Sequence, residues 1–369
     1  MNGRAALLIE PNRDMVIREF PVPDPEPGAV VIRVTRCNIC GSDVHAWQGN
    51  FKIQGLGASL PAILGHEMVG RILALGEGVL TDSWGQSLHE GDRVVFPYFN
   101  FCGHCPSCTM GFPLGCQNLH MAMLGNPQEF PYFVGGFADY YYLPPRHVLF
   151  KVPNTLSDDV VSGANCALSQ VIYGFSRSGL TMGESVVIQG AGGLGLYALV
   201  AAKQMGASPI IVLDAFMPRL ELARSFGADV VVHIDHYGVP ERVRMVRKVT
   251  AGLGVDHAMD VSGNPSAMVE GLSMVRPGGH YIEIGSINLG KTVEIDPSRL
   301  VFGNKTIIGV SLYEPFALKK ALELLSHTQG RLPFQSLLQD SFPLSQINEA
   351  LQVAVSRRAN RATVNLEME

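Results

Sequence analysis

The feature that most constrains this chain is a glycine-rich turn that joins an apolar run to a helix-forming segment. The turn reads Gly190-Ala191-Gly192-Gly193-Leu194-Gly195, and it directly follows the run 185–189. A helix that begins at such a turn offers unpaired N–H groups and the positive end of its dipole to an anion. Gly190 permits the tight turn, Gly192 lets phosphates approach closely, and Gly195 lets the helix lie against the strand. The turn therefore predicts a site for the pyrophosphate of a dinucleotide.

A carboxylate follows this turn at the expected distance. A second apolar run, 209–213, ends at Asp214, about 20 residues beyond the turn. A carboxylate there accepts hydrogen bonds from the adenosine ribose diol and repels a 2′-phosphate, so Asp214 favours NAD over NADP. The alternative role for Asp214 is to cap the N-terminus of the next helix.

Six apolar runs alternate with amphipathic segments across this part of the chain. The helix-forming segments include 194–205, 219–226 and 266–275. Such alternation predicts a parallel, doubly wound α/β sheet with helices on both faces. The predicted strands are 185–189, 209–213, 230–234, 257–261, 280–284 and 306–310.

The residues on either side of this segment differ in character. Strand-like runs separated by turns rich in proline and glycine occur at 4–9, 29–36, 69–75 and 92–96. The segment from residue 314 onward is mixed, with a helix candidate at 316–326. A chain of 369 residues is long enough for two domains, so we expect a β-rich domain beside the α/β one.

Four cysteines lie within fifteen residues of one another. Cys102, Cys105 and Cys108 are separated by two residues each, and Cys116 follows them. Two-residue gaps let one chain wrap a single ion, so the cluster predicts a closed, tetrahedral, structural zinc site. An iron–sulfur cluster is the main alternative, because thiolates hold those clusters as well.

Composition excludes several classes of function. The chain is 47% hydrophobic and 17% charged, which is typical of a globular protein, and its net charge of −5 gives no basic surface for nucleic acid. Charge-free tracts are interrupted by glycine, proline or cysteine, so we expect no membrane-spanning helix. The chain has seven cysteines, an odd number, and its first residues lack the apolar core of a signal peptide. Both features argue against a disulfide framework and favour a reducing, cytoplasmic location.

Taken together, these motifs resemble those of the zinc-dependent medium-chain dehydrogenases, the alcohol dehydrogenase superfamily. The markers are Cys40-Gly41-Ser42-Asp43-Val44-His45, Gly65-His66-Glu67, the four-cysteine lobe, Cys166, and the glycine turn with Asp214. The resemblance implies a GroES-like β-rich catalytic domain, built from 1–166 and 303–369, whose structural-zinc lobe covers about residues 100–120. It also implies a six-stranded Rossmann domain for NAD, inserted at 167–302.

The resemblance further implies a second, catalytic zinc, so that each chain would hold two. Its ligands would be Cys40, His66 and Cys166, with a position open for water or substrate, and Glu67 would coordinate transiently or in some resting forms. Asp43 would orient His66.

Three alternatives to these roles stand beside the resemblance. Cys166 could be a small buried core residue. Cys37 and Cys40 could form a redox pair, although Cys37 suits the core of the preceding strand better. Asp43 could simply form a turn.

Further residues would serve the chemistry of this site. In such enzymes a zinc-bound alcohol loses its proton and then gives a hydride to NAD. Ser42 would contact the alcohol oxygen, and His45 would end a proton relay near solvent, unless His45 is only a surface residue. Arg361 would contact a cofactor phosphate, unless it is a solvated charge like its neighbours Arg357 and Arg358. The family often has a basic residue at position 41, where this chain has Gly41.

The substrate is the least constrained prediction. We expect the partner to be a small molecule. It would be an apolar primary, secondary or cyclic alcohol, or the corresponding carbonyl compound. The pocket candidates are Trp47, Phe51, Leu56, Phe99 and Met123, all of which could instead be core residues. The alternatives are a larger secondary alcohol such as a CoA thioester or a polyol, and a non-catalytic protein that binds zinc and NADH. Relatives of this kind form homodimers or homotetramers, and we expect one of these here.

Overall fold

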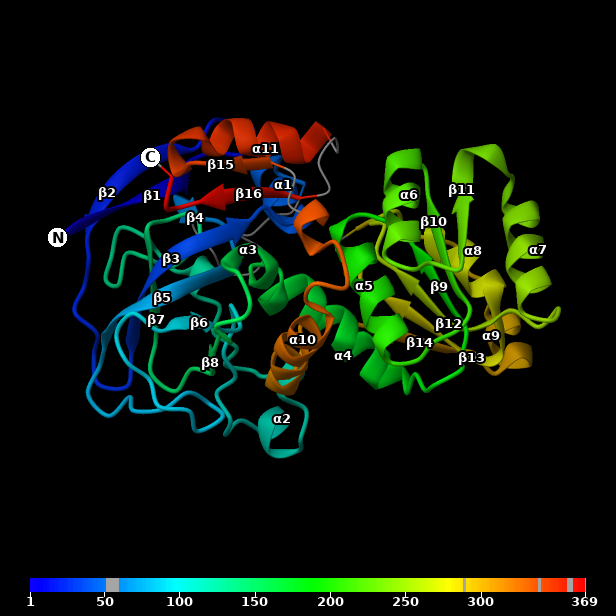
Figure 1. The fold of residues 1–369 in the computed structure, drawn as a ribbon, viewed down its shortest axis with the longest axis horizontal. Coiled ribbons are helices and arrows are strands. Elements are labelled where there is room, and N and C mark those ends of the chain that lie inside the picture. The colour runs from blue at the N-terminus through cyan, green and yellow to red at the C-terminus, as the bar shows by residue number, and fades with distance from the viewer. Residues whose placement is uncertain (51–59, 288–289, 338–339, 357–360, 369) are drawn as a thin grey trace. The chain divides into compact units, whose positions relative to one another are not determined.

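The computed structural model describes residues 1–50, 60–287, 290–337, 340–356 and 361–368 (Figure 1). The chain forms two compact units. The first comprises Met1–Cys166, Glu314–Gln329 and Phe334–Glu369, and the second comprises Ala167–Tyr313 and Gly330–Pro333. The first boundary agrees with the predicted one. The chain returns to the first unit at Glu314 rather than at residue 303, because β14 (Thr306–Gly309) pairs with β13 (Val275–Glu283) inside the second unit.

The second unit is built on a six-stranded parallel sheet whose order is β11-β10-β9-β12-β13-β14. The strand order reverses between β9 and β12, as in the predicted Rossmann fold. Every residue of β9 and β10 is buried, because helices cover both faces of the sheet and leave no polar side. The four strands not yet located are β9 (Val186–Gln189), β10 (Ile210–Asp214), β11 (Val230–His233) and β12 (Val255–Asp260).

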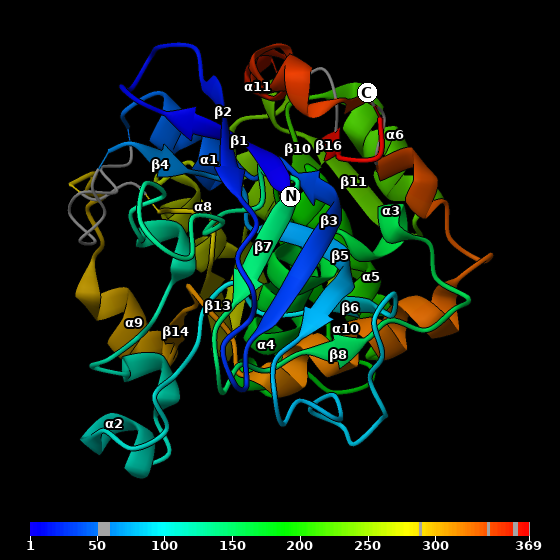
Figure 2. The ribbon, with the colours of Figure 1, turned by 90° about the vertical axis from the view of Figure 1, so that its left-hand side faces the viewer.

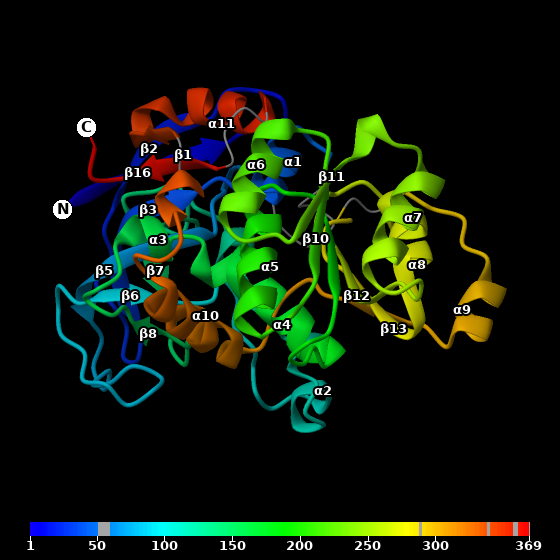
Figure 3. The ribbon, with the colours of Figure 1, turned by 45° about the vertical axis from the view of Figure 1, so that its right-hand side comes forward.

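Helices flank this sheet on both sides. Figure 3 shows α4, α5 and α6 on one face and α7, α8 and α9 on the other. Under the second group, Val187 and Ile211 of the sheet pack against Leu272 and Tyr281 in a continuous core. The helices are α4 (Ser169–Ser178), α5 (Gly193–Gln204), α6 (Met217–Ser225), α7 (Val239–Val249), α8 (Ala267–Met274) and α9 (Pro297–Gly303).

The first unit is β-rich and draws on both ends of the chain. Its larger sheet runs β15-β16-β3-β5-β6-β8, with β7 also paired to β3, and a smaller sheet runs β2-β1-β4. Figure 2 looks onto this unit, where β3 and β5 lie side by side. Because β16 pairs antiparallel with β3, the C-terminal segment completes the sheet that the N-terminal segment begins.

The strands of this unit are β1 (Asn2–Leu8), β2 (Val16–Pro21), β3 (Val30–Asn38), β4 (Ala62–Ile63), β5 (Glu67–Leu75), β6 (Arg93–Val95), β7 (Tyr140–Leu143), β8 (Phe150–Lys151), β15 (Asp340–Phe342) and β16 (Ala362–Asn365). Its helices are α1 (Gly41–Trp47), α2 (Pro106–Thr109), α3 (Asp158–Val161), α10 (Pro315–Thr328) and α11 (Ile347–Ser356). Within the described ranges, no helix combines the length and the apolar character that crossing a bilayer requires.

Candidate functional site

Four side chains of the first unit converge on one point. The ligand atoms of Cys40, His66, Glu67 and Cys166 all lie within 4.8 Å of one another. Cys40 precedes α1, His66 precedes β5, and Glu67 is the first residue of β5. Cys166 belongs to a π-helical turn, Ala164–Leu168, a local irregularity that often marks functional sites. The predicted ligands are thus brought together by segments far apart in the sequence.

The imidazole of His66 is held by Asp43. The His66 Nδ1 atom lies 3.3 Å from Asp43 Oδ1, and Asp43 itself accepts hydrogen bonds from the backbone N–H groups of Gly65 at 3.0 Å and Cys40 at 2.9 Å. This arrangement directs Nε2 toward the other ligand atoms, which is how carboxylates orient metal-binding histidines. Burial lowers the pKa of His66, but Asp43 and Cys40 outweigh that effect and raise it to about 10. Metal binding must therefore displace a proton from this ring.

The two sulfurs of the cluster divide one proton between them. A hydrogen bond from Cys166 lowers the pKa of Cys40 well below its usual range, while the same bond and burial raise the pKa of Cys166. Two sulfurs, one imidazole nitrogen and one carboxylate oxygen at this spacing suit Zn²⁺, because zinc takes tetrahedral N, S and O ligands. The residues therefore fit a zinc ion with three protein ligands and either Glu67 or an open fourth position.

Glu67 has a second partner that was not predicted. Its carboxylate is fully buried and forms an ion pair with Arg361, whose side chain is also buried. Asn38 Nδ2 donates to the same carboxylate oxygen at 3.5 Å. Arg361 is thus not a solvated charge, and its predicted contact with a cofactor phosphate stays a prediction. Its neighbours Arg357 and Arg358 lie outside the described residues.

The predicted relay residues both lie on α1. Ser42 Oγ is 3.5 Å from His66 Nε2, so its hydroxyl borders the candidate metal position. His45 lies one turn further along the same short helix, with its Nδ1 atom buried. The roles of the two residues stay predictions.

Sequence reasoning missed Tyr98 and Asn165. The Tyr98 ring lies 4.7 Å from the His66 ring, and its hydroxyl hydrogen-bonds to Cys166, which partly offsets the rise in the pKa of Cys166 caused by Cys40 and burial. Asn165 Nδ2 donates to the backbone oxygens of His66 at 2.9 Å and Phe96 at 3.0 Å. Asn165 directly precedes Cys166, and that adjacency was the only local indication of its role.

The predicted pocket residues have different fates. Phe99 is buried, with its ring edge-on to Tyr98 at 5.0 Å. Trp47 is buried, and its Nε1 donates to Arg13 O at 2.8 Å, as in a core residue. Met123 is half-buried, whereas Phe51 and Leu56 lie outside the described residues. Cys37 is buried on β3 and takes no part in the ligand cluster, in agreement with its predicted core position.

The second cysteine cluster also assembles. The sulfurs of Cys102, Cys105, Cys108 and Cys116 lie within 4.8 Å of one another around the short helix α2. Backbone N–H groups face the sulfurs: Cys105 N is 3.3 Å from Cys102 Sγ, and Cys102 N is 3.3 Å from Cys116 Sγ. Such groups, that of His104 foremost, lower the pKa of Cys102 to about 6. Four sulfurs at this spacing suit a structural zinc ion.

The glycine turn of the second unit has the predicted shape. Gly190 has φ of +107°, and a Cβ on Gly195 would lie 1.9 Å from the Gly190 carbonyl oxygen. A Cβ on Gly192, the residue before α5, would have 3.7 Å to its nearest neighbour. Helix-to-strand packing therefore demands glycine at 195, while Gly192 leaves space beside the helix N-terminus for an anion.

Asp214 is the last residue of β10 and lies beside this turn. Its carboxylate oxygens accept hydrogen bonds from Ala191 N at 2.6 Å and Phe216 N at 2.9 Å. The first of these ties the side chain to the turn rather than to the next helix, which begins only after Phe216. The position fits a ribose-binding carboxylate, and that role stays a prediction.

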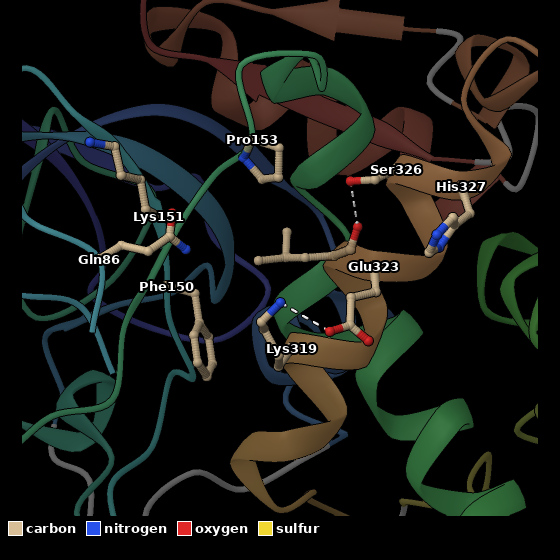
Figure 4. Close-up of a pocket in the computed structure, with 9 residues that line it drawn as sticks. Gln86, Phe150, Lys151, Pro153, Lys319, Glu323, Ser326 and His327 are labelled. Carbon is tan, nitrogen blue, oxygen red and sulfur yellow. Dashed lines mark hydrogen bonds and ion pairs between the residues drawn. The ribbon is translucent and has the colours of Figure 1, made fainter. Parts of the chain in front are cut away.

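A small pocket of the first unit is lined by other residues than the two ligand clusters (Figure 4). Lys151 and Lys319 border it, but each ammonium already pairs with a carboxylate, Asp92 at 2.7 Å and Glu323 at 3.0 Å. None of the cluster residues lines this cavity of about 150 Å³. It supplies no group to the candidate site.

Comparison with known proteins agrees with these observations. Residues 26–154 match the family model described as alcohol dehydrogenase GroES-like domain, and residues 193–327 match the one described as zinc-binding dehydrogenase. The chain is 32% identical to 5-exo-hydroxycamphor dehydrogenase of Pseudomonas putida, over 95% of each chain. It is 30% identical to sorbitol dehydrogenase of Bacillus subtilis, over 96% of this chain and 94% of the relative.

A solved structure shows the same architecture. The alcohol dehydrogenase of Thermotoga maritima superposes with a TM-score of 0.93 at 29% identity, over 99% of both chains. Family, fold and the donor set of the clusters thus agree on an oxidoreductase that uses zinc and a nicotinamide cofactor. The chain belongs to the family of zinc-dependent medium-chain alcohol dehydrogenases.

Proposed function

We propose that this protein transfers a hydride between NAD(H) and an alcohol or carbonyl compound, with a catalytic zinc held by Cys40, His66 and Cys166. A single observation carries the proposal: two sulfurs and one imidazole nitrogen converge, and Asp43 orients the histidine that supplies this nitrogen. The four-cysteine lobe would hold the second zinc ion of each chain, with a structural role.

The chain's own residues would manage the proton. When bound, zinc supplies Lewis acidity at the substrate oxygen and NAD supplies the hydride acceptor. Ser42 would accept the hydroxyl proton of the alcohol while passing its own proton on. His45 would receive that proton, because imidazole ordinarily titrates near neutrality. Glu67, held by Arg361, would occupy the fourth metal position when no substrate is present.

Asp214 supports NAD rather than NADP as the cofactor. Its buried carboxylate is fixed beside the glycine turn, where a 2′-phosphate would meet a negative charge. Asp214→Ser should therefore reduce the preference for NAD⁺ over NADP⁺, and an unchanged preference would contradict the ribose role.

The aromatic neighbours of the cluster favour an apolar substrate. Tyr98 is buried against His66, Phe99 packs behind Tyr98, and together they make this side of the cluster aromatic. The names of two relatives suggest two substrate classes: 5-exo-hydroxycamphor is a cyclic alcohol, and sorbitol is a polyol. We favour the apolar primary, secondary or cyclic alcohol. A larger secondary alcohol, such as a CoA thioester, is the second candidate.

A substrate screen tests the proposal. The zinc-loaded protein would be assayed for NADH and NADPH formation with primary, secondary, cyclic and polyol substrates. We expect turnover with at least one apolar alcohol and a preference for NAD⁺. Absence of turnover with every alcohol, while two zinc ions remain bound, would instead favour a non-catalytic zinc- and NADH-binding protein.

We further propose that the protein is a cytoplasmic homodimer or homotetramer. All seven cysteines are free of disulfides, which suits a reducing compartment. Edge strand β14 exposes Ile307, and the neighbouring Phe302 is 86% exposed, so this edge offers an apolar surface to a second copy. Light scattering would establish the number of chains, and a monomer at micromolar concentration would contradict the assignment.

A further inference from the structure

Two acidic residues lie side by side at the carboxyl edge of the parallel sheet. Asp260 is the last residue of β12, Glu283 is the last residue of β13, and the two are register partners. Paired residues of neighbouring parallel strands present their side chains on the same face. Asp260 is fully buried and Glu283 is largely so, and neither takes part in the mechanism proposed above.

Each carboxyl group has one oxygen with a donor and one without. Asp260 Oδ1 accepts from Ser262 N at 2.8 Å, and Glu283 Oε1 accepts from Ser286 N at 2.9 Å. The other oxygens, Asp260 Oδ2 and Glu283 Oε2, are buried and meet no donor among the described residues. The two groups are within hydrogen-bonding reach of each other. Two carboxylates side by side at a site with little access to water repel each other, which favours the binding of a proton by one of them.

One other proton-bearing group, the Tyr281 hydroxyl, is within hydrogen-bonding reach of Glu283, and it keeps its own proton because burial raises its pKa. Tyr281, also on β13, donates its hydroxyl to Gln189 Oε1 at 3.4 Å. Gln189 Nε2 is itself engaged with Ala267 O at 2.8 Å. The acidic residue that faces this region from α8 is Glu270, which is neutralised by Arg242 of α7 at 2.6 Å. These neighbours are engaged with other groups, so the charge of the carboxyl pair depends on whether the pair itself binds a proton.

The loops that this pair holds lie against the glycine turn. Ser262 provides the backbone N–H for Asp260, and a Cβ on Gly190 would lie 3.1 Å from Ser262 Cα. A Cβ on Gly285 would lie 2.6 Å from Gly263 N, so the loops after β12 and β13 interlock. Ligands of open α/β sheets bind at the carboxyl edge where the strand order reverses, here between β9 and β12.

We propose that Asp260 and Glu283 share a single proton, and that this protonated pair positions the two loops that border the cofactor crevice. A hydrogen bond O–H···O⁻ between the side chains ties the end of β12 to the end of β13. Loss of the proton leaves two negative charges in contact in a buried site, which pushes the loops apart. The link to cofactor binding rests on the function proposed above.

The shared proton has a defined pH range. Burial foremost, and then the charge of Asp260, raise the pKa of Glu283 to about 7, and burial also raises the pKa of Asp260. A raised carboxyl pKa means that the folded state binds the proton more tightly than the unfolded state. The contribution to stability is therefore complete below the ordinary glutamate pKa of 4.5, and it is lost as pH rises through about 7.

Infrared spectroscopy of the cofactor-free protein tests the shared proton. We expect the carbonyl stretching band of a protonated carboxylic acid, which disappears as pH rises through neutrality. The band should be missing in Glu283→Gln and in Asp260→Asn, because an amide donates the same hydrogen bond without a titrating proton. Glu294→Gln, on an exposed carboxylate of the same unit, should keep it. A wild-type spectrum without such a band would overturn the proposal.

Fluorescence titration with NADH between pH 6 and 9 tests the positioning role. The wild-type affinity should fall with pH by at most tenfold per pH unit, because one proton is linked. Glu283→Gln should bind NADH with nearly constant affinity, and Glu294→Gln should behave like the wild type. Parallel pH profiles for the wild type and Glu283→Gln would overturn the positioning role. Failure of the wild type to bind NADH would contradict the proposed function itself, while the infrared band would still report on the proton.

Discussion

Cys166 is the residue on which the assignment of the catalytic metal depends most. It lies buried in a π-helical turn, 100 positions after His66 in the chain, yet its sulfur lies within 4.8 Å of the other ligand atoms. Cys166→Ala should remove about one zinc ion per chain and lower turnover by about three orders of magnitude or more, because the site loses a ligand. Zinc analysis and kinetics measure both effects.

Cys37→Ala is the matched control, since Cys37 is equally buried but outside the ligand cluster. That variant should keep both zinc ions and its activity. A Cys166→Ala protein with two zinc ions and normal turnover would show that the ligand assignment is wrong.

Tyr98 offers a finer test of the same site. Tyr98→Phe keeps the ring beside His66 and removes the hydroxyl that hydrogen-bonds to Cys166. A thiolate without this donor gives more charge to the metal, so kcat should fall by about tenfold, as for other groups that support metal ligands. With cobalt in place of zinc, the thiolate-to-metal absorption band should shift. Tyr140→Phe is the control, because among the described groups the Tyr140 hydroxyl contacts only Met1 Sδ, at 3.5 Å, and its loss should leave the band in place. An unshifted band in Tyr98→Phe would contradict the supporting role of the Tyr98 hydroxyl.

The sequence motifs located the metal ligands but not their supporting contacts. Cys40, His66 and Cys166 stand in local patterns that a reader can recognise. Two supporting contacts join segments far apart in the chain: Tyr98 with Cys166, 68 residues apart, and Arg361 with Glu67, 294 residues apart. No local sequence pattern predicts such contacts. The second contact depends on β5 and β16 lying in one sheet, which brings the start of β5 to the residue before β16.

At the scale of elements, the glycine turn provides a pair of contrasting substitutions. Gly195→Ala places a Cβ 1.9 Å from the Gly190 carbonyl oxygen, so the α5 helix must move away from β9. We expect a loss of about 1–3 kcal/mol or more in the free energy of unfolding, as for other substitutions that overpack a core. Gly192→Ala meets nothing closer than 3.7 Å and should keep its stability but bind NADH more weakly. Denaturant unfolding and fluorescence titration separate the two effects; equal stabilities would contradict the packing role of Gly195.

The cysteine lobe should act as a separable structural element. Cys105→Ala should remove the second zinc ion and lower the melting temperature, while the remaining zinc supports turnover whenever the protein is folded. Ser107→Ala, within the same short helix α2, is the control that keeps the metal. Iron in place of zinc in the purified protein would favour the iron–sulfur alternative and overturn this assignment.

Strands with an apolar run of several residues were predictable, and strands of two residues were not. The runs that became β9, β10 and β11 are correct to within one residue, because these strands consist mainly of apolar residues. Strands β4 and β8 have only two residues each, too few for any alternation to show. β13 begins at Val275 rather than at residue 280, since Gly278 and Gly279 do not read as a strand.

At the scale of the whole molecule, the sequence indicated two domains and misplaced one boundary. The return to the first unit was expected at residue 303, but the chain first adds β14 to the edge of the parallel sheet. The alternating pattern itself predicted a strand at 306–310 and a change of character at residue 314, so the error lies in the boundary taken from the family resemblance. The pairing of β16 with β3 is likewise a contact between the two ends of the chain, which composition and periodicity cannot show.

The most direct test of the central claim follows the hydride itself. An alcohol that supports turnover would be labelled with deuterium on its carbinol carbon and incubated with NAD⁺ and either the wild type or Cys166→Ala. Mass spectrometry should find one deuterium in each NADH molecule made by the wild type. The variant should make almost no NADH. NADH without the label, or equal labelled product from both proteins, would contradict zinc-dependent hydride transfer at this site.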